Sequence, residues 1–193
     1  MTARITIPPQ VQALLRQLNA AGFSAYAVGG CVRDSLLGCA PQDWDICTSA
    51  LPEQVLDVFP GSRPTGIKHG TVTVVIGSRS AEVTTFRSEG DYADHRHPSS
   101  VAFVGDLTTD LMRRDFTMNA MAVSADGLII DPYGGAEDIR RGCIRCVGAP
   151  EKRFDEDALR MLRAFRFSSR LGFEIEPATL AAIGKKAPLA AGL

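Results

Sequence analysis

The chain has 193 residues, of which 45% are hydrophobic and 22% charged, a balance that indicates a folded core and disfavours a disordered chain. Its formal net charge is −1, which excludes a protein that grips nucleic acid through an overall basic surface. Residues 137–193 nevertheless hold 11 Lys and Arg against 8 Asp and Glu, whereas residues 1–136 hold 10 against 14. Any contact with a nucleic acid is therefore expected to be local.

The five cysteines are an odd number in a chain without a signal peptide, which favours reduced thiols in a cytosol-like compartment. Cys143 and Cys146 form a C-x-x-C pair, but no second pair follows and the three histidines lie far away in the sequence. Because a structural zinc needs four ligands, buried thiols are the better interpretation. Apolar runs such as residues 72–76 are far too short to cross a bilayer, so we expect a soluble, cytoplasmic protein.

Helical and strand-like patterns alternate in the first hundred residues. Apolar residues at helical spacing follow Pro8 and Pro9 and stop at Gly22, which predicts a first helix. Two β-branched runs separated by residues 77–80 predict a hairpin. In chain order, the expected elements are this helix, a strand over 24–28, a helix over 31–37, a strand around 43–47, a helix over 52–59, and strands over 71–76 and 81–86.

Helices dominate the later part of the chain. A polar stretch over residues 88–100 predicts a mobile surface loop. The elements expected after it are helices over 107–113 and 116–121, a strand over 128–130, a turn over 131–135, one long helix over 153–171, and the start of another over 178–183. This order predicts an α+β fold with a mixed sheet of about five strands flanked by helices, followed by an all-helical extension. We expect a catalytic domain over residues 1–136 and the extension over 137–193, truncated within helix-like sequence.

Two carboxylates flank a tryptophan in Asp43-Trp44-Asp45. Side chains two positions apart on a strand point to the same face, so Asp43 and Asp45 are expected to converge while Trp44 packs on the other side. Paired oxygen ligands without a neighbouring imidazole or thiolate favour Mg²⁺ and two-metal chemistry on a phosphate. A solvated strand edge is the alternative. Glu82, in the following hairpin, is either a third carboxylate of the same pocket or a solvated surface residue.

A diglycine precedes these carboxylates in Gly29-Gly30-Cys31-Val32-Arg33-Asp34. Glycines between a strand and a helix let backbone N–H groups approach a phosphate, and Arg33 adds a charged donor one turn later. An ordinary tight turn is the alternative, and the pattern is neither a P-loop nor a dinucleotide-binding motif. A diglycine turn followed about ten residues later by D-x-D resembles the nucleotidyltransferase superfamily.

The expected helix over 153–171 carries a basic stripe, because arginines recur at spacings of three, three and four. The stripe consists of Arg160, Arg163, Arg166 and Arg170. The apolar residues expected to face a core are Ala158, Leu159, Leu162 and Phe165. Asp157 precedes Arg160 by three positions and shares its face. Either the stripe binds an anion or the segment is a solvated amphipathic helix.

Asp157 and Arg160 have a chemical use as a pair. Cytosine and adenine each present an amine donor beside a bare ring nitrogen, so Asp157 can accept from the amine while Arg160 donates to the nitrogen. Uracil and guanine present the opposite arrangement. Such a pair selects C and A over U and G, and a site built on hydrogen bonds can reject the mismatched base by roughly 10⁴-fold.

Five segments occur in the order found in one family. They are residues 29–34, Asp43 with Asp45, Arg113-Arg114-Asp115-Phe116-Thr117-Met118-Asn119-Ala120, residues 131–135, and Glu156-Asp157 with Arg160. From about Ala25 to Phe173, the chain resembles the class II CCA-adding and bacterial poly(A) polymerase family. The resemblance implies a nucleotidyltransferase-type head followed by a helical neck. Full-length members are about twice as long and carry helical body and tail domains, which we do not expect within these 193 residues.

The resemblance also implies roles for individual residues. Asp43 and Asp45 would hold Mg²⁺, while Asp157 and Arg160 would read the base. The triphosphate and other parts of the nucleotide would contact Gly30, Arg33, Arg114, Arg163 and Arg166. Asp115 and Asn119 would hold the helix or the ribose in place.

The implied reaction is template-independent transfer of CMP and AMP from CTP and ATP to the 3′ end of tRNA. Residues 89–98 resemble the flexible loop of members that add the terminal A, so CC-only addition is the weaker option and A-only addition stays open. Poly(A) polymerase activity and a non-catalytic nucleotide- or RNA-binding remnant are the alternatives. The sequence leaves the oligomeric state open.

Overall fold

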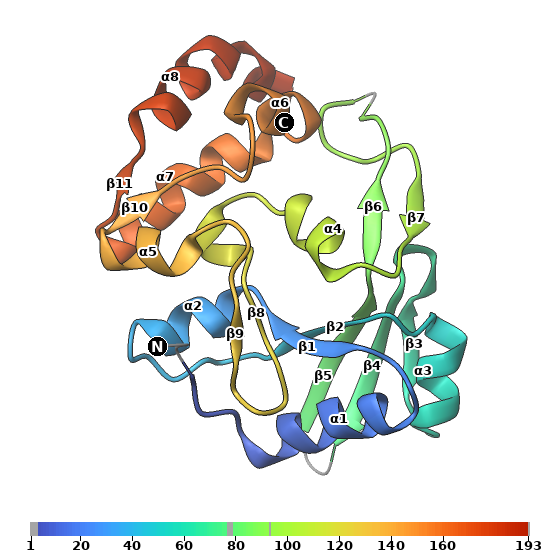
Figure 1. The fold of residues 1–193 in the computed structure, drawn as a ribbon. Coiled ribbons are helices and arrows are strands. Elements are labelled where there is room, and N and C mark those ends of the chain that lie inside the picture. The colour runs from blue at the N-terminus through green and yellow to red at the C-terminus, as the bar shows by residue number, and fades with distance from the viewer. Residues whose placement is uncertain (1–3, 77–78, 93, 193) are drawn as a thin grey trace.

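A seven-stranded mixed sheet organises the first part of the computed structural model, which describes residues 4–76, 79–92 and 94–192 (Figure 1). The strand order is β3-β4-β5-β2-β1-β8-β9, and only β2 and β5 pair in parallel. The strands are β1 (Ala25–Val28), β2 (Asp45–Thr48), β3 (Arg63–Gly66), β4 (Thr71–Ile76), β5 (Arg79–Thr85), β8 (Ala122–Val123) and β9 (Ile129–Ile130). The α+β class is confirmed, but the expectation of about five strands was too low, because the short β3 and β8 gave no alternating pattern.

The two faces of the sheet pack into different apolar clusters. Ala27 and Ile46 point to the face covered by α1 (Pro9–Ala20), where Leu14 is fully buried. Their neighbours Val28 and Cys47 point to the other face, together with Phe86, Leu111 and Ala120. This alternation follows from the two-residue period of a strand. The chain turns at Gly29, directly after β1. The expected helices α2 (Gly30–Leu36) and α3 (Pro52–Val58) are present at the ends of the sheet.

The stretch over 88–100, expected to be entirely loop, begins and ends in a hairpin. β6 (Arg87–Glu89) pairs antiparallel with β7 (Val101–Phe103). The expected turn over 77–80 lies partly outside the described residues, since 77 and 78 are not described. α4 (Leu107–Met112) is confirmed, whereas the helix expected over 116–121 is only the single 3₁₀ turn η2 (Thr117–Asn119).

The long helix expected over 153–171 is broken, and the prediction of one helix is wrong. The chain forms α6 (Pro150–Glu156) and α7 (Leu159–Leu171), with Asp157 in an extended conformation at φ −140° and ψ 103°. The backbone N–H of Ala158 donates to the carbonyl of His95 at 2.9 Å, and a ring nitrogen of His95 lies 2.6 Å from the carbonyl of Asp155. A segment distant in sequence therefore satisfies the groups that the break exposes.

The apolar face of α7 also differs from the expectation. Met161, Ala164 and Phe167 are buried with Ala158, whereas Leu162 and Phe165 are 50% and 49% exposed. Leu159 is partly buried and borders a cavity. Apolar residues occur on several sides of this helix, so periodicity permitted more than one buried face, and packing selected the one that carries Phe167.

The part of the chain after residue 137 is not purely helical. β10 (Cys143–Ile144) and β11 (Glu174–Ile175) form a parallel two-stranded sheet among the helices α5 (Gly135–Arg140), α6, α7 and α8 (Pro177–Lys186). The remaining short turns are η1 (Ile67–His69) and η3 (Ala187–Gly192). Figure 1 shows α6, α7 and α8 gathered above the sheet. The boundary predicted at residue 137 falls inside α5 and stays a prediction.

Candidate active site

One cavity of about 790 Å³ joins the two segments that the sequence analysis singled out. The acidic segment that enters β2 borders it on the sheet side, and the arginines of α7 border it from the later part of the chain. Nine of the ten predicted site residues line it, namely Gly30, Arg33, Asp43, Asp45, Arg114, Asp157, Arg160, Arg163 and Arg166. Arg170, the last arginine of the predicted stripe, lines it as well. The roles of these residues stay predictions, but their juxtaposition is a property of the fold.

The carboxylates of Asp43 and Asp45 are exposed to this cavity, while Trp44 between them is buried. Burial raises the pKa of Asp45, Arg114 opposes this, and the charges of Glu82 and Asp43 raise it further. The two carboxylates thus form a locally negative site with oxygen donors only.

This donor set fits Mg²⁺, which proteins commonly hold through one or two carboxylates and substrate phosphates. Within the described residues, no group of three or more His, Cys, Asp and Glu side chains is arranged to hold a metal by itself. Water molecules and phosphate oxygens of a nucleotide would complete the coordination of an ion held by the two carboxylates.

Glu82 lies outside this cavity. It stands on β5 and lines an adjoining pocket of about 270 Å³, together with Asp45, Arg87 and Arg114. Its charge is close enough to raise the pKa of Asp45. The structure therefore brings Glu82 near the two aspartates without placing it in the same cavity, and its catalytic role stays a prediction.

The diglycine turn brings backbone to the cavity wall. Gly29 has a φ of +78°, and a Cβ built there would lie 3.0 Å from Nη1 of Arg114, so the turn combines an unusual conformation with close packing. Arg33 of α2 is only 6% exposed. It forms an ion pair with Asp34 at 2.7 Å and donates to Oδ1 of Asn119 at 2.6 Å. The guanidinium is therefore held in a fixed orientation at the cavity.

Asp115 connects the sheet domain to α7. Its Oδ1 accepts from the backbone N–H of Phe116 at 2.8 Å and from Asn119 at 3.1 Å. Its Oδ2 forms an ion pair with Arg163 at 2.7 Å. Asp115 and Asn119 thus hold Arg163 and Arg33, a structural function compatible with the expectation that they keep neighbouring parts of the site in place.

Arg160 is buried, and three groups fix it. Its guanidinium forms an ion pair with Glu156 at 2.9 Å and donates to the carbonyls of Arg113 at 3.0 Å and Arg153 at 3.4 Å. Nε of Arg160 lies 4.0 Å from Oδ2 of Asp157, and both side chains border the cavity. The helix break moves Asp157 off the regular helix, yet a carboxylate acceptor and a guanidinium donor still lie side by side.

A second network at the cavity was not predicted from the sequence. Asp110 is fully buried and forms ion pairs with Arg113 at 3.0 Å and Arg114 at 3.4 Å. Glu89 forms an ion pair with Arg113 at 2.9 Å and with Arg87 at 3.1 Å. The pairs of Asp110 are local, at helical spacings of three and four, whereas the pair of Glu89 with Arg113 joins β6 to the end of α4, a contact that no local pattern contains. Adjacent Arg113 and Arg114 were the one visible indication.

The tyrosine of the 88–100 stretch belongs to the same network. The hydroxyl of Tyr92 hydrogen-bonds Glu89, and burial together with this acidic neighbour raises the pKa of Tyr92. Tyr92 and Arg96 both line the cavity, so this stretch forms part of its wall.

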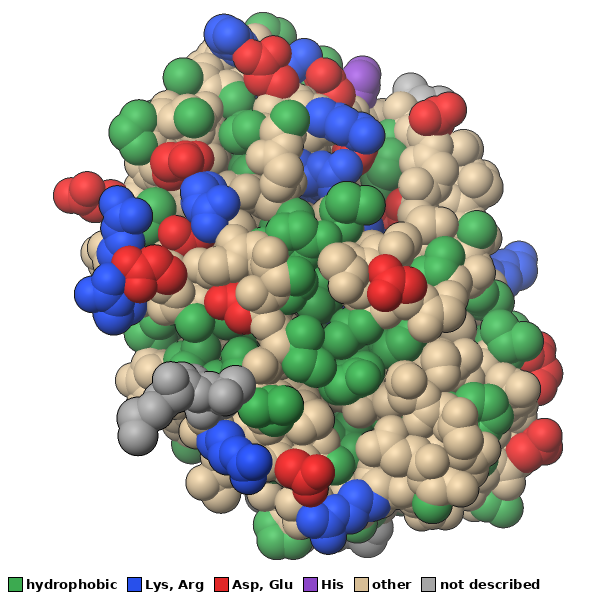
Figure 2. All heavy atoms as spheres, in the orientation of Figure 1, with side chains coloured by type: hydrophobic (Ala, Val, Ile, Leu, Met, Phe, Trp, Pro, Cys, Tyr) green, Lys and Arg blue, Asp and Glu red, His purple; other side chains and the backbone are tan. Residues whose placement is uncertain are grey.

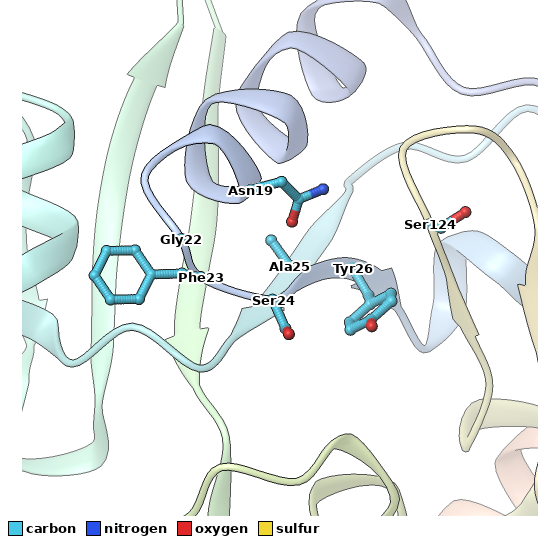
Figure 3. Close-up of a pocket in the computed structure, with 7 residues that line it drawn as sticks. All are labelled: Asn19, Gly22, Phe23, Ser24, Ala25, Tyr26 and Ser124. Carbon is cyan, nitrogen blue, oxygen red and sulfur yellow. The ribbon is translucent and has the colours of Figure 1, made fainter.

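A different hollow, of about 340 Å³, lies beside the end of α1 and β1 (Figure 3). It is lined by Asn19, residues 22–26 and Ser124, and holds no charged side chain. Acidic and basic side chains are interspersed over the face in Figure 2. The charged cavity between β2 and α7 is therefore the better candidate for phosphate chemistry.

All five cysteines are free in the structure; Cys31, Cys47 and Cys146 are buried, Cys143 is half-buried and Cys39 is exposed. Burial raises the pKa of Cys31 and of Cys146 to about 12. In the described ranges, no helix has the length and apolar character that crossing a membrane requires.

Known proteins match nearly the whole chain in sequence. Residues 25–145 match the family model described as the poly(A) polymerase head domain. The CCA-adding enzyme of Geobacillus stearothermophilus is 57% identical over 186 residues, which make up 95% of this chain and 46% of that protein. The CCA-adding enzyme of Limosilactobacillus fermentum is 49% identical over 176 residues, 91% of this chain and 44% of that protein. The chain spans about half the length of these curated relatives.

Solved structures share the fold. A crystal structure of the Bacillus stearothermophilus CCA-adding enzyme in complex with CTP matches with a TM-score of 0.89 and 52% identity, over 97% of this chain and 46% of that chain. The Thermotoga maritima CCA-adding enzyme complexed with tRNA matches with a TM-score of 0.75 and 29% identity, over 94% of this chain and 43% of that one.

Proposed function

Because the chain belongs to the poly(A) polymerase head domain family, we propose that it is the catalytic and nucleotide-selecting part of a tRNA nucleotidyltransferase. It transfers CMP and AMP from CTP and ATP to the 3′ end of tRNA, with the protein reading the incoming base. The observation that carries this proposal is the single cavity bordered by Asp43, Asp45 and the α7 arginines. The relatives named CCA-adding enzymes support the choice of tRNA as acceptor.

The reaction is attack of the RNA 3′-hydroxyl on the α-phosphate, with pyrophosphate leaving. Asp43 and Asp45 would hold Mg²⁺, which would supply charge neutralisation and activation of the attacking hydroxyl. The chain's own residues position the reactants: the turn at Gly30 and the guanidinium groups of Arg33 and Arg166 bind the anionic triphosphate. Positioning and electrostatic stabilisation provide the catalysis, and no protein nucleophile takes part.

Base selection follows from Asp157 and Arg160. The carboxylate accepts from the exocyclic amine of cytosine or adenine, and the guanidinium donates to the adjacent ring nitrogen. Glu156 and the carbonyl of Arg113 fix Arg160, so its donor direction is set before the nucleotide arrives. A rigid reader rejects uracil and guanine because each would leave buried hydrogen-bonding groups unpaired.

A-only addition and polyadenylation use the same cavity and differ in the acceptor and in the number of nucleotides added. A non-catalytic remnant would bind nucleotide without transferring it. We place the reaction in the cytoplasm, where tRNA is processed in the bacteria that carry these relatives.

The test combines nucleotide binding with turnover. The protein is mixed with Mg²⁺ and each of the four nucleoside triphosphates, and binding is followed by calorimetry. Labelled CTP and ATP are then supplied with tRNA that lacks its CCA end. We expect binding of CTP and ATP in preference to UTP and GTP, and addition of C, C and A in that order.

Variants separate the possible outcomes. Asp43→Ala combined with Asp45→Ala should fold and transfer nothing, whereas Asp126→Ala, which removes an exposed carboxylate paired with Arg16 at 3.6 Å, should behave as the unaltered protein. Transfer by the double variant would refute the metal assignment. Nucleotide binding without transfer by the unaltered protein would favour the remnant, and long A tails would favour polyadenylation.

A further inference from the structure

Three arginines of the cavity converge on one aromatic ring. The guanidinium carbons of Arg33, Arg163 and Arg166 lie 5.2, 5.4 and 5.2 Å from the centroid of the Phe167 ring. Each distance is within the roughly 6 Å over which a cation is attracted to the negative face of an aromatic ring. We propose that Phe167 is a positioning residue that gathers these arginines into one binding surface for the triphosphate of the incoming nucleotide. The inference rests on the nucleotide-binding role of the cavity proposed above.

The electrostatics of this cluster indicate why a ring is needed. Arg33 is paired with Asp34 and Arg163 with Asp115, both at 2.7 Å. Among residues 4–76, 79–92 and 94–192, no carboxylate forms an ion pair with Arg166. Three positive charges therefore meet two negative ones and repel one another. The ring offers attraction without adding a competing negative charge, which leaves the cluster attractive to an anion.

The ring itself is fixed. Phe167 is 5% exposed and packs edge to face against Phe116, with centroids 5.9 Å apart and planes at 87°. Phe116 is fully buried and directly follows Asp115, the partner of Arg163. A ring held on the protein side by Phe116 is a preorganised surface, so the arginines need little reorganisation when a ligand binds.

Phe167 also joins two distant parts of the chain. Arg33 lies on α2, beside the sheet, whereas Arg163 and Arg166 lie on α7. Arg33 and Arg166 have the Phe167 ring as their common contact. A substitution that keeps the apolar volume but removes the aromatic ring would therefore separate the two sets of cations while preserving the core.

The experiment compares Phe167→Leu, Phe167→Met and Phe167→Tyr with the unaltered protein. Calorimetric or competition binding is measured for CTP and for CMP, which lacks the β- and γ-phosphates. For Phe167→Leu and Phe167→Met, we expect the Kd of CTP to rise about ten-fold and that of CMP to change by less than about two-fold. Phe167→Tyr keeps the ring and should retain CTP affinity.

A matched control comes from the same helix. Phe165 is two residues earlier and about half exposed, and it does not line the cavity. Phe165→Leu should therefore leave CTP binding unchanged, and thermal unfolding of all variants reports any general loss of structure. Before nucleotide is added, ring-current shifts of the arginine side-chain resonances should be seen in the unaltered protein and lost in Phe167→Leu.

Each outcome decides the matter. Equal CTP affinity in Phe167→Leu and the unaltered protein would overturn this inference and leave the proposed function standing. So would an equal loss of affinity for CTP and CMP. So would a Phe167→Tyr variant that binds CTP as weakly as Phe167→Leu. Failure of the unaltered protein to bind CTP contradicts the proposed function and the role of the ring together.

Discussion

Asp157 and Arg160 lie 4.0 Å apart at the wall of the cavity, although Asp157 sits in the break between α6 and α7 and Arg160 inside α7. The backbone N–H of Leu159 donates to Oδ1 of Asp157 at 3.0 Å, which anchors the carboxylate and leaves Oδ2 directed to Arg160. The break therefore fixes the carboxylate that we propose as the hydrogen-bond acceptor for the base. In one continuous helix, Asp157 would have helical φ and ψ, and its side chain would lie on the helix surface one turn before Arg160.

Removing this carboxylate should reduce base discrimination more than it reduces binding. In Asp157→Ala, the preference for CTP over UTP should fall by about 10- to 100-fold, because one charged hydrogen bond to the matched base and one repulsion of the mismatched base are both lost. Kd values for the four nucleotides measure this. Asp155→Ala is the control, since Asp155 pairs with Lys186 at 2.7 Å and does not line the cavity. An unaltered CTP-to-UTP ratio in Asp157→Ala would contradict the reader.

Asp115 should matter for stability as well as for Arg163. Its carboxylate is buried and accepts from a backbone N–H, from Asn119 and from Arg163. Asp115→Ala leaves these donors unpaired, so the free energy of unfolding should fall by about 2 kcal/mol, discounted because Arg163 is partly solvated. For a chain of this size the melting temperature should drop by about 4–8 °C.

Calorimetry or circular dichroism measures this drop. The control Asp126→Ala removes an exposed carboxylate and should change the melting temperature by less than about 2 °C. A drop of similar size in both variants would show that Asp115 does not connect the two parts of the chain.

Local patterns predicted the carboxylate pair and most elements, but not features that depend on long-range contacts. The alternation around Trp44 is contained in three adjacent residues, so it was visible in the sequence. The backbone N–H that follows the break at Asp157 donates to the carbonyl of the distant His95. Phe165 and Phe167 are the same residue type on one helix, yet the first is half exposed and the second buried, because the fold gives them different neighbours. No sequence pattern contains those neighbours.

Dependence on long-range contacts also separates the site residues that were predicted from those that were missed. Arginine spacing and the resemblance to a family pointed to the cavity-lining residues. Glu82 was expected either as a third carboxylate of the same pocket or as a solvated surface residue; it lines an adjoining pocket that it shares with Asp45. Glu89 reaches Arg113 from another element, and the burial of Asp110, which pairs locally with Arg113, became visible only in the fold.

Gly29 should resist substitution for two separable reasons. Its φ of +78° with ψ −128° is a backbone conformation that costs any other residue about 1–3 kcal/mol, and an added Cβ would lie 3.0 Å from Nη1 of Arg114. Gly29→Ala should therefore lower the free energy of unfolding and also weaken CTP binding by displacing Arg114. Gly38→Ala is the matched control, because Gly38 has a φ of +74° with nothing within 4 Å of an added Cβ.

Both glycine variants should lose stability in urea unfolding because of their positive φ, and only Gly29→Ala should bind CTP more weakly, by several-fold. Equal CTP affinity in the two variants would show that the space beside Arg114 is not needed for nucleotide binding.

Glu89 should make stability depend on acid pH. Burial raises the pKa of Glu89, but Arg113, the hydrogen bond from Tyr92, and Arg87 outweigh burial and leave the pKa below its ordinary value. A carboxyl group with a depressed folded-state pKa contributes stability above its unfolded pKa, about 4.3, and loses that contribution as pH falls through the folded-state pKa. Glu89→Gln should therefore have a lower free energy of unfolding than the unaltered protein at pH 7, and the difference should shrink below about pH 4.

Urea unfolding across this pH range measures the difference, with Glu53→Gln in the exposed first turn of α3 as the control. A difference between Glu89→Gln and the unaltered protein that stays constant with pH would mean that the ion pairs of Glu89 do not stabilise the fold through its charge.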